Sequence, residues 1–110
     1  MRAARLRRSG DIATVRAEGR SLRRRAFNVR VRPSGGLITR VAVTASRTVG
    51  TAVVRNRARR RVREAFRLAI ASESQPTAID VLVRVRPEAK DSDFREIESE
   101  ALSVLREAAR

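Results

Sequence analysis

The chain has 110 residues, with 26 Lys or Arg against 12 Asp or Glu, so its formal net charge is +14. This length fits one domain, 1–110, with a modest core. Cys and His are absent, which excludes disulfides, thiolate or imidazole metal sites, and Cys or His catalysis. No apolar run approaches the roughly 20 residues of a membrane-spanning helix, and none follows the basic N-terminus, so we expect a cytoplasmic protein without a membrane partner.

Positive charge is concentrated in the first two thirds of the chain. Residues 1–67 carry 20 Arg and three acids, whereas residues 68–110 carry five Arg, one Lys and nine acids. The first part alone therefore has a net charge of +17. This asymmetry favours a polyanionic partner for the first part, with the acidic last third as a structural element that faces away from it.

The first predicted element is a short helix that starts at Ser9-Gly10-Asp11 and ends at Gly19. Residues 20–25 form a basic run that suits a short strand or a loop. Residues 27–32 and 41–46 each alternate in the manner of a half-buried strand. Because a turn sequence at 33–36 separates these two runs, we expect them to pair as a hairpin.

Residues 52–71 predict the main helix, because apolar residues recur there at helical spacing. The expected apolar stripe consists of Val54, Ala58, Val62, Ala65, Phe66, Ala69 and Ile70. Residues 72–77, which include Pro76, are interpreted as a linker.

Residues 79–85 predict a strand that is covered on at least one face and ends at Pro87. Asp93 with Glu96 predicts a capping box at the start of a last helix. The apolar stripe of that helix consists of Phe94, Ile97, Ala101, Val104, Leu105 and Ala108. The order of elements predicts a small α/β sandwich.

The segment from Arg55 to Arg63 has six Arg among nine residues. On a helix these residues form a basic face opposite the apolar stripe, and Arg67 extends it. The first turn adds free backbone N–H groups and the positive end of the helix dipole, both suited to phosphate. Asn56 can donate and accept, as recognition of a base edge or ribose requires. The alternative is a solvated charged face that confers solubility.

The acids do not suggest a catalytic site. Asp11, Glu18 and Glu64 are the acids of the basic region, and they are scattered along the chain. A two-metal nuclease needs several converging carboxylates. We expect Glu64 to pair with Arg60 or Arg61 along the helix. No catalytic residue and no protein metal site are predicted.

The block from 46 to 67 resembles the signature of the bacterial ribonuclease P protein component. The matching residues are Ser46-Arg47, Val49-Gly50, Ala52-Val53-Val54-Arg55-Asn56-Arg57, Arg59-Arg60 and Arg63-Glu64-Ala65-Phe66-Arg67. Weaker matches at Asp11-Ile12, Gly19-Arg20-Ser21, Phe27, Asp80-Val81 and Arg86-Pro87 extend the resemblance over most of the chain.

The resemblance implies a two-layer α/β sandwich with a four-stranded sheet and the order α-β-β-β-α-β-α. Its short extra strand would fall near residues 21–23. The main helix would lie in a left-handed crossover, against the usual right-handed rule.

The resemblance also implies a protein subunit of ribonuclease P, whose catalytic RNA removes the 5′ leader of precursor tRNA. The partners would be that RNA and precursor tRNA, with no further protein required. The cofactor would be Mg²⁺, held mainly by the RNA and the substrate.

Two sets of site residues follow from the resemblance. The RNA-binding set is Ser46, Arg47, Arg55, Asn56, Arg57, Arg59, Arg60, Arg63 and Arg67. The set for a leader-binding cleft is Ile12, Arg16, Arg30 and Arg86. The family often places aromatic residues at three of these cleft positions. We hypothesise that Arg16 and Arg30 replace them through guanidinium stacking and phosphate contacts. The alternative is that they are ordinary surface arginines.

Two other functions remain open at this point. One is a structural or chaperone-type RNA-binding protein of ribosomal type, which would share the basic face but assist no cleavage. The other is a protein-only nuclease, which the missing His and the scattered acids disfavour.

Overall fold

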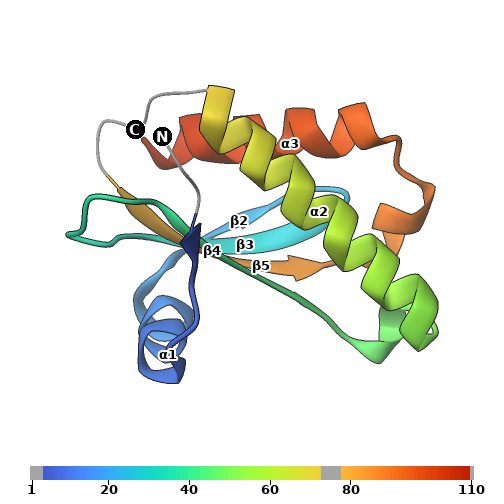
Figure 1. Cartoon of the computed structure of the whole chain (residues 1–110), viewed down its shortest axis with the longest axis horizontal. Coiled ribbons are helices and arrows are strands. Elements are labelled where there is room, and N and C mark those ends of the chain that lie inside the picture. Colours follow the sequence, from blue (N-terminus) through green and yellow to red (C-terminus); the bar gives the residue numbers. More distant parts are fainter. Residues whose placement is uncertain (1–3, 73–77, 110) are drawn as a thin grey trace.

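The computed structural model describes residues 4–72 and 78–109. One five-stranded sheet has helices α2 and α3 on one face and helix α1 on the other (Figure 1). The elements in chain order are β1 (Ala4–Arg5), α1 (Ser9–Glu18), β2 (Arg20–Arg23), β3 (Phe27–Pro33), β4 (Arg40–Ala45), η1 (Arg47–Val49), α2 (Ala52–Ser72), β5 (Ile79–Val85), η2 (Pro87–Asp91) and α3 (Phe94–Ala108).

The strand order is β1-β4-β5-β3-β2. Strand β5 lies at the centre, antiparallel to β3 and parallel to β4. The predicted hairpin between the strands at 27–32 and 41–46, which are β3 and β4, is therefore wrong, because β5 lies between them. The reason lies in β5 itself, whose side chains are buried on both faces apart from Arg84. A strand that is apolar on both faces is best buried at the centre of a sheet.

The α/β class is confirmed. The elements occur in the expected order, but a two-residue strand, β1, which the sequence did not suggest, precedes them. The short extra strand expected near residues 21–23 is β2. Helix α1 covers the second face of the sheet, so the structure has one layer more than the expected two. Of the predicted linker, Ser72 is the last residue of α2, and 73–77 lie outside the described residues. The hand of the crossover β4–α2–β5 stays a prediction.

The main core lies between the sheet and helices α2 and α3. Phe27 of β3 meets Phe66 of α2 with ring centroids 5.1 Å apart, in a tilted arrangement. The predicted stripe of α2 is buried from Ala58 to Ile70, but Val54 is 37% exposed and does not belong to it. Among the helices of the described residues, none is long and apolar enough to cross a membrane.

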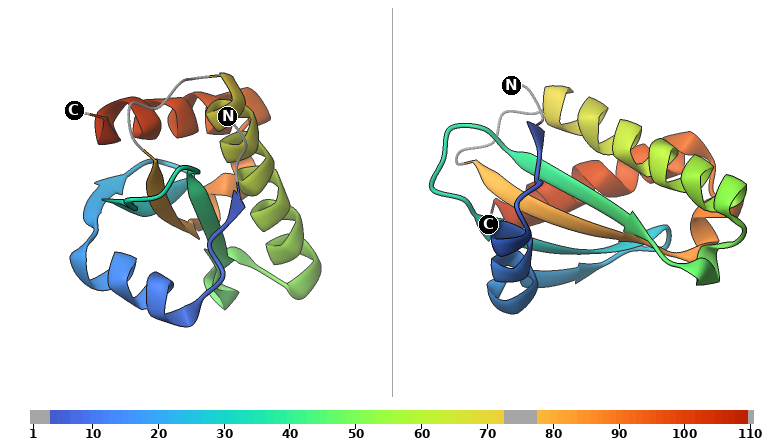
Figure 2. Two further views of the ribbon diagram at one scale, coloured as in Figure 1. Left: turned by 60° about the vertical axis from the view of Figure 1, so that its left-hand side comes forward. Right: turned by 60° about the horizontal axis from the view of Figure 1, so that its bottom comes forward.

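A second, smaller core holds α1 against the opposite face. Leu6, Val15 of α1 and Leu82 of β5 are buried together there, and Ile12 packs partly buried beside them. α1 and α2 thus lie on opposite faces of the sheet, as both views of Figure 2 show. This core sets the spacing of α1 from the sheet.

Ion pairs with Arg40 also hold the first turn of α1 against the sheet. Arg40 of β4 donates to both carboxylate oxygens of Asp80, at 2.8 and 2.7 Å, and to Asp11 of α1 at 3.2 Å. Asp80 is 2% exposed. The hydrogen bonds with Asp80 are the main cause of a raised pKa for Arg40. The guanidinium thus stays charged and ties α1 to two strands.

Candidate nucleic-acid interface

The exposed side of α2 carries Arg55, Arg57, Arg59, Arg60 and Arg63, which we call the arginine face. Arg57 and Arg60 are exposed, and the other three are half-buried. Within residues 4–72 and 78–109, no carboxylate forms an ion pair with any of the five. Five neighbouring cations without a counter-charge repel one another, and a polyanion would relieve that repulsion.

The remaining α2 residues of the RNA-binding set already have partners. Arg67 donates to Glu64, which differs from the expected pairing of Glu64 with Arg60 or Arg61. These bonds lower the pKa of Glu64. The pairing with Arg67 arises because positions three apart also lie side by side on a helix. Asn56 Oδ1 accepts a hydrogen bond from Arg59.

Arg61 lies on α2 but acts inside the protein. Its guanidinium donates to the backbone carbonyls of Ala89, at 3.2 Å, and Ser92, at 3.0 Å. Arg61 therefore ties α2 to the segment that leads into α3.

Arg63 marks the place where like charges are most crowded. Its partial burial lowers its pKa, and the charges of Arg5 and Arg59 lower it further. Arg5 belongs to β1, so the short strand that the sequence did not suggest adds a cation beside the arginine face.

The segment before α2 brings Ser46 and Arg47 to its N-terminal end. Ser46 is half-buried and its hydroxyl bonds that of Thr48 at 2.6 Å, whereas Arg47 is exposed on η1. Gly50 then turns the chain with φ +148°, where a Cβ atom would approach Val54 at 3.0 Å. The predicted lead-in residues are thus held next to the first turn of α2.

A cleft of about 450 Å³ lies between α1 and the sheet. It contains both predicted arginines, Arg16 of α1 and Arg30 of β3, and no carboxylate lines it. The full lining is Arg16, Ser21, Asn28, Val29, Arg30, Thr44, Leu82 and Arg84. Three guanidinium groups without a lining acid suit a phosphate-bearing ligand.

Two residues predicted for the cleft lie elsewhere. Ile12 of α1 packs against the second core, because its apolar side chain is partly shielded from water there. Arg86 follows the end of β5 and donates to the carbonyls of Arg24 and Arg25 at 3.0 and 3.2 Å. It also pairs with Glu88 at 2.8 Å. These bonds hold Arg86 outside the cleft.

The sequence interpretation missed Asn28 and Arg84 as cleft residues. Asn28 precedes Arg30 by two positions, so the period of two along β3 was a sufficient signal. Arg84 faces Asn28 across the β3–β5 pair. That neighbour was hidden because the expected hairpin placed β4 beside β3.

A larger groove of about 690 Å³ lies between the start of α2 and the start of α3. Its walls mix three cations with three acids: Arg57, Arg61, Lys90, Asp91, Asp93 and Glu96. Glu96 also accepts the N–H of Asp93 at 3.0 Å in the predicted capping box. Because its charges balance, this groove suits a polyanion less than the cleft does.

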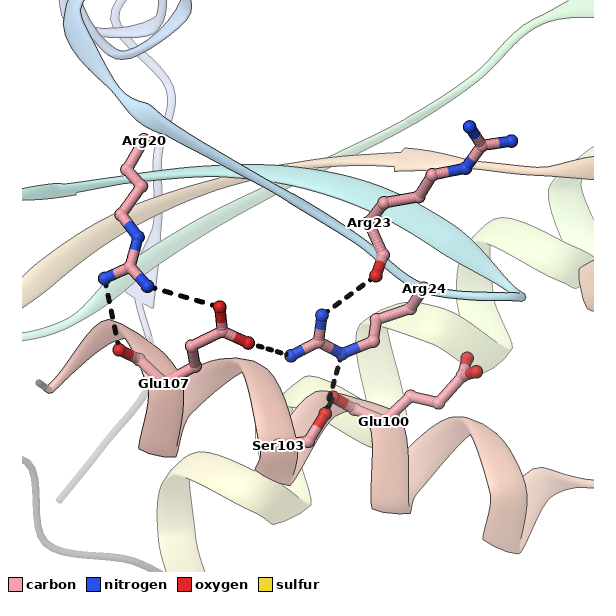
Figure 3. A network of polar contacts seen from close by, with 6 residues as sticks. All are labelled: Arg20, Arg23, Arg24, Glu100, Ser103 and Glu107. Atoms are coloured by element: carbon pink, nitrogen blue, oxygen red, sulfur yellow. Dashed lines mark hydrogen bonds and ion pairs between the residues drawn. The ribbon is translucent and has the colours of Figure 1, made fainter.

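Residues of α3 bind two arginines of the basic run 20–25, Arg20 and Arg24, whereas the guanidinium of Arg23 points away from α3 (Figure 3). Glu107 accepts from Arg20 at 3.2 Å and from Arg24 at 2.7 Å. Glu100 accepts the backbone N–H groups of Arg25 and Ala26 at 3.1 and 3.0 Å. The acids of the last third therefore hold the β2–β3 turn and leave α2 uncompensated.

The family model for ribonuclease P matches residues 1–109. The chain belongs to the ribonuclease P protein family. It is 39% identical to the ribonuclease P protein component of Chloroflexus aurantiacus over 108 residues, which cover 97% of this chain and 78% of that one. It is therefore the protein subunit of an endoribonuclease that processes the 5′ end of tRNA, and its partner is the ribonuclease P RNA.

Solved structures of the ribonuclease P protein family share the fold. The Thermotoga maritima protein matches with a TM-score of 0.79 and 30% identity, over 94% of this chain and 96% of that one. The Staphylococcus aureus protein matches with a TM-score of 0.74 and 27% identity, over 96% and 94%. Membership of this family decides against a structural protein of ribosomal type.

Proposed function

We propose that the arginine face binds the catalytic RNA and that the cleft beside α1 binds the 5′ leader of precursor tRNA. The observation that carries this proposal is the absence of counter-charges. Within the described residues no carboxylate pairs with the arginine face, and none lines the cleft. The two surfaces lie on opposite faces of the sheet, so one protein can contact two RNA segments at once.

In the cleft, Arg16 and Arg30 take the place that aromatic residues often have in the family. A guanidinium plane stacks on a base and its N–H groups donate to phosphate, so one residue type serves both contacts. Arg30 is held in position because its Nη1 donates to the carbonyl of Gly19 at 3.1 Å. Arg16 is exposed, so its side chain can adjust to the position of the RNA leader.

Hydrolysis itself is assigned to the RNA subunit with Mg²⁺. Mg²⁺ prefers phosphate and carboxylate oxygens, which the RNA and the substrate supply in abundance. Among the described residues, no three His, Cys, Asp or Glu gather where they could hold a metal ion. The protein would contribute affinity for RNA and leader, and thereby favour cleavage at low Mg²⁺.

The proposal is tested by reconstituting the enzyme from this protein and its catalytic RNA at low Mg²⁺. We expect cleavage of precursor tRNA where the RNA alone is inactive. Replacing Arg16 and Arg30 by Ala should weaken binding of leader-bearing precursor far more than binding of mature tRNA. The matched control is Arg32→Ala, because Arg32 lies on the same strand outside the cleft, with Glu18 at 3.7 Å. An equal loss for precursor and mature tRNA would reject the leader site.

A further inference from the structure

The cleft beside α1 presents hydrogen-bond donors and hides its amide acceptor. Asn28 Oδ1 is buried without a partner, so the amide NH₂ is the end that faces the cleft. The guanidinium groups of Arg16, Arg30 and Arg84 can only donate. The side-chain acceptors left in the lining are the hydroxyls of Ser21 and Thr44, and Thr44 already donates to the carbonyl of Val83 at 3.3 Å.

This donor surface discriminates between bases. Guanine offers two acceptors, O6 and N7, on its major-groove edge, whereas adenine places an amino donor beside its N7. Against three guanidinium groups and an amide NH₂, the amino group of adenine finds few acceptors. Against the paired donors of one guanidinium edge, the adenine amino group meets a donor where guanine offers an acceptor, so the guanine edge is favoured.

Arg30 is the residue best placed to recognise a base edge. It is half-buried, and its Nη1 is bound to the carbonyl of Gly19 at the end of α1. Gly19 packs so closely that a Cβ atom there would lie 3.1 Å from the Cβ of Arg30. The fixed guanidinium keeps its Nε and Nη2 edge as a pair of parallel donors, which matches the spacing of O6 and N7 in guanine.

We propose that this cleft selects a guanosine in the leader of precursor tRNA. Arg30 donates to its O6 and N7, the Asn28 NH₂ adds a further donor, and the exposed Arg16 and Arg84 contact the flanking phosphates. This inference rests on the proposed leader-binding role of the cleft.

The test uses the reconstituted enzyme and precursor tRNAs whose leader is all adenosine except for one guanosine. The guanosine is moved one position at a time, and the affinity for each precursor is measured. We expect one position at which guanosine tightens binding by about tenfold. Replacing that guanosine by 7-deazaguanosine removes the N7 acceptor, and most of the gain should be lost.

Two conservative variants show whether Arg30 is responsible. Arg30→Lys keeps the positive charge but loses the planar pair of donors, so it should abolish the guanosine preference while the all-adenosine leader still binds. Arg32→Lys makes the same exchange outside the cleft and should leave the preference unchanged. A guanosine preference that survives in Arg30→Lys would overturn the assignment.

The outcomes separate this inference from the proposed function. If no position favours guanosine while leader-bearing precursor still binds more tightly than mature tRNA, the base selection is wrong and the leader site stands. If removal of the leader does not change affinity, the leader site itself is wrong.

Discussion

Helices α2 and α3 pack side by side on one face of the sheet, yet their charges do opposite work (Figure 2). The arginine face of α2 has no carboxylate partner among the described residues, whereas Glu107 and Glu96 of α3 pair with Arg20, Arg24 and Arg25. The proposed RNA contact therefore falls on arginines that pair with no carboxylate among the described residues.

The same contrast explains why charge density alone does not locate the proposed RNA surface. The runs 20–25 and 55–63 are similarly rich in Arg. In the first run, Glu107 of α3 pairs with Arg20 and Arg24, and Glu96 pairs with Arg25. In the second run, Arg57 and Arg61 line a groove together with Glu96, but among the described residues no carboxylate forms an ion pair with the arginine face.

The strongest structural pairing is predicted to be that of Arg40 with Asp80. Arg40→Met keeps the apolar stem but leaves the Asp80 carboxylate buried without a cation, so the free energy of unfolding should fall by about 3 kcal/mol. Urea unfolding followed by circular dichroism measures this loss. A loss below about 0.5 kcal/mol, the range of ordinary surface substitutions, would show that the pairing does not hold α1.

A smaller loss is expected at the β2–β3 turn. Glu100→Ala removes the acceptor of two backbone N–H groups, one of them at buried Ala26, and should cost about 1–2 kcal/mol of unfolding free energy. Glu98→Ala, on the same helix, is the control and should cost less. The affinity for the catalytic RNA should stay within a few-fold in both variants. Equal stability of the two variants would argue against a structural role for Glu100.

The smallest effect concerns Arg67 of the predicted RNA-binding set, which forms an ion pair with Glu64. Glu64→Gln frees Arg67 and should raise RNA affinity a few-fold, with a log–log salt slope steeper by roughly 0.7–0.9. Acidification is a poorer way to free Arg67, because its hydrogen bonds lower the pKa of Glu64 and the pair is lost only as the pH falls through that lowered value. An unchanged salt slope in Glu64→Gln would place Arg67 outside the RNA contact.

Much of the fold could be predicted because it rests on local patterns. The helical spacing of apolar residues located α2 and α3, and Gly19 marked the end of α1. The pairing of strands could not be predicted in the same way, because β5 inserts between two strands that precede it by more than 30 residues. Such non-local pairing leaves no periodic signal in either partner.

The candidate site divides along the same line. The arginine face and the placement of Arg16 and Arg30 follow from periodicity along single elements, together with the resemblance. Arg84 lines the cleft although it was not predicted there, and Arg86 lies outside the cleft although it was. Both placements depend on neighbours that are distant in the sequence. Likewise, nothing local distinguishes Arg61, which binds two carbonyls, from the exposed Arg60.

The most direct test compares two double variants that remove the same charge from the two kinds of surface. Arg57→Gln with Arg60→Gln alters the arginine face, and Arg20→Gln with Arg25→Gln alters exposed arginines that pair with Glu107 and Glu96. The salt dependence of affinity for the catalytic RNA is measured for both. We predict that the log–log slope falls by roughly 1.4–1.8 for the first and hardly at all for the second. Equal changes in the two slopes would contradict the account, since RNA would then respond to total charge and not to the arginine face.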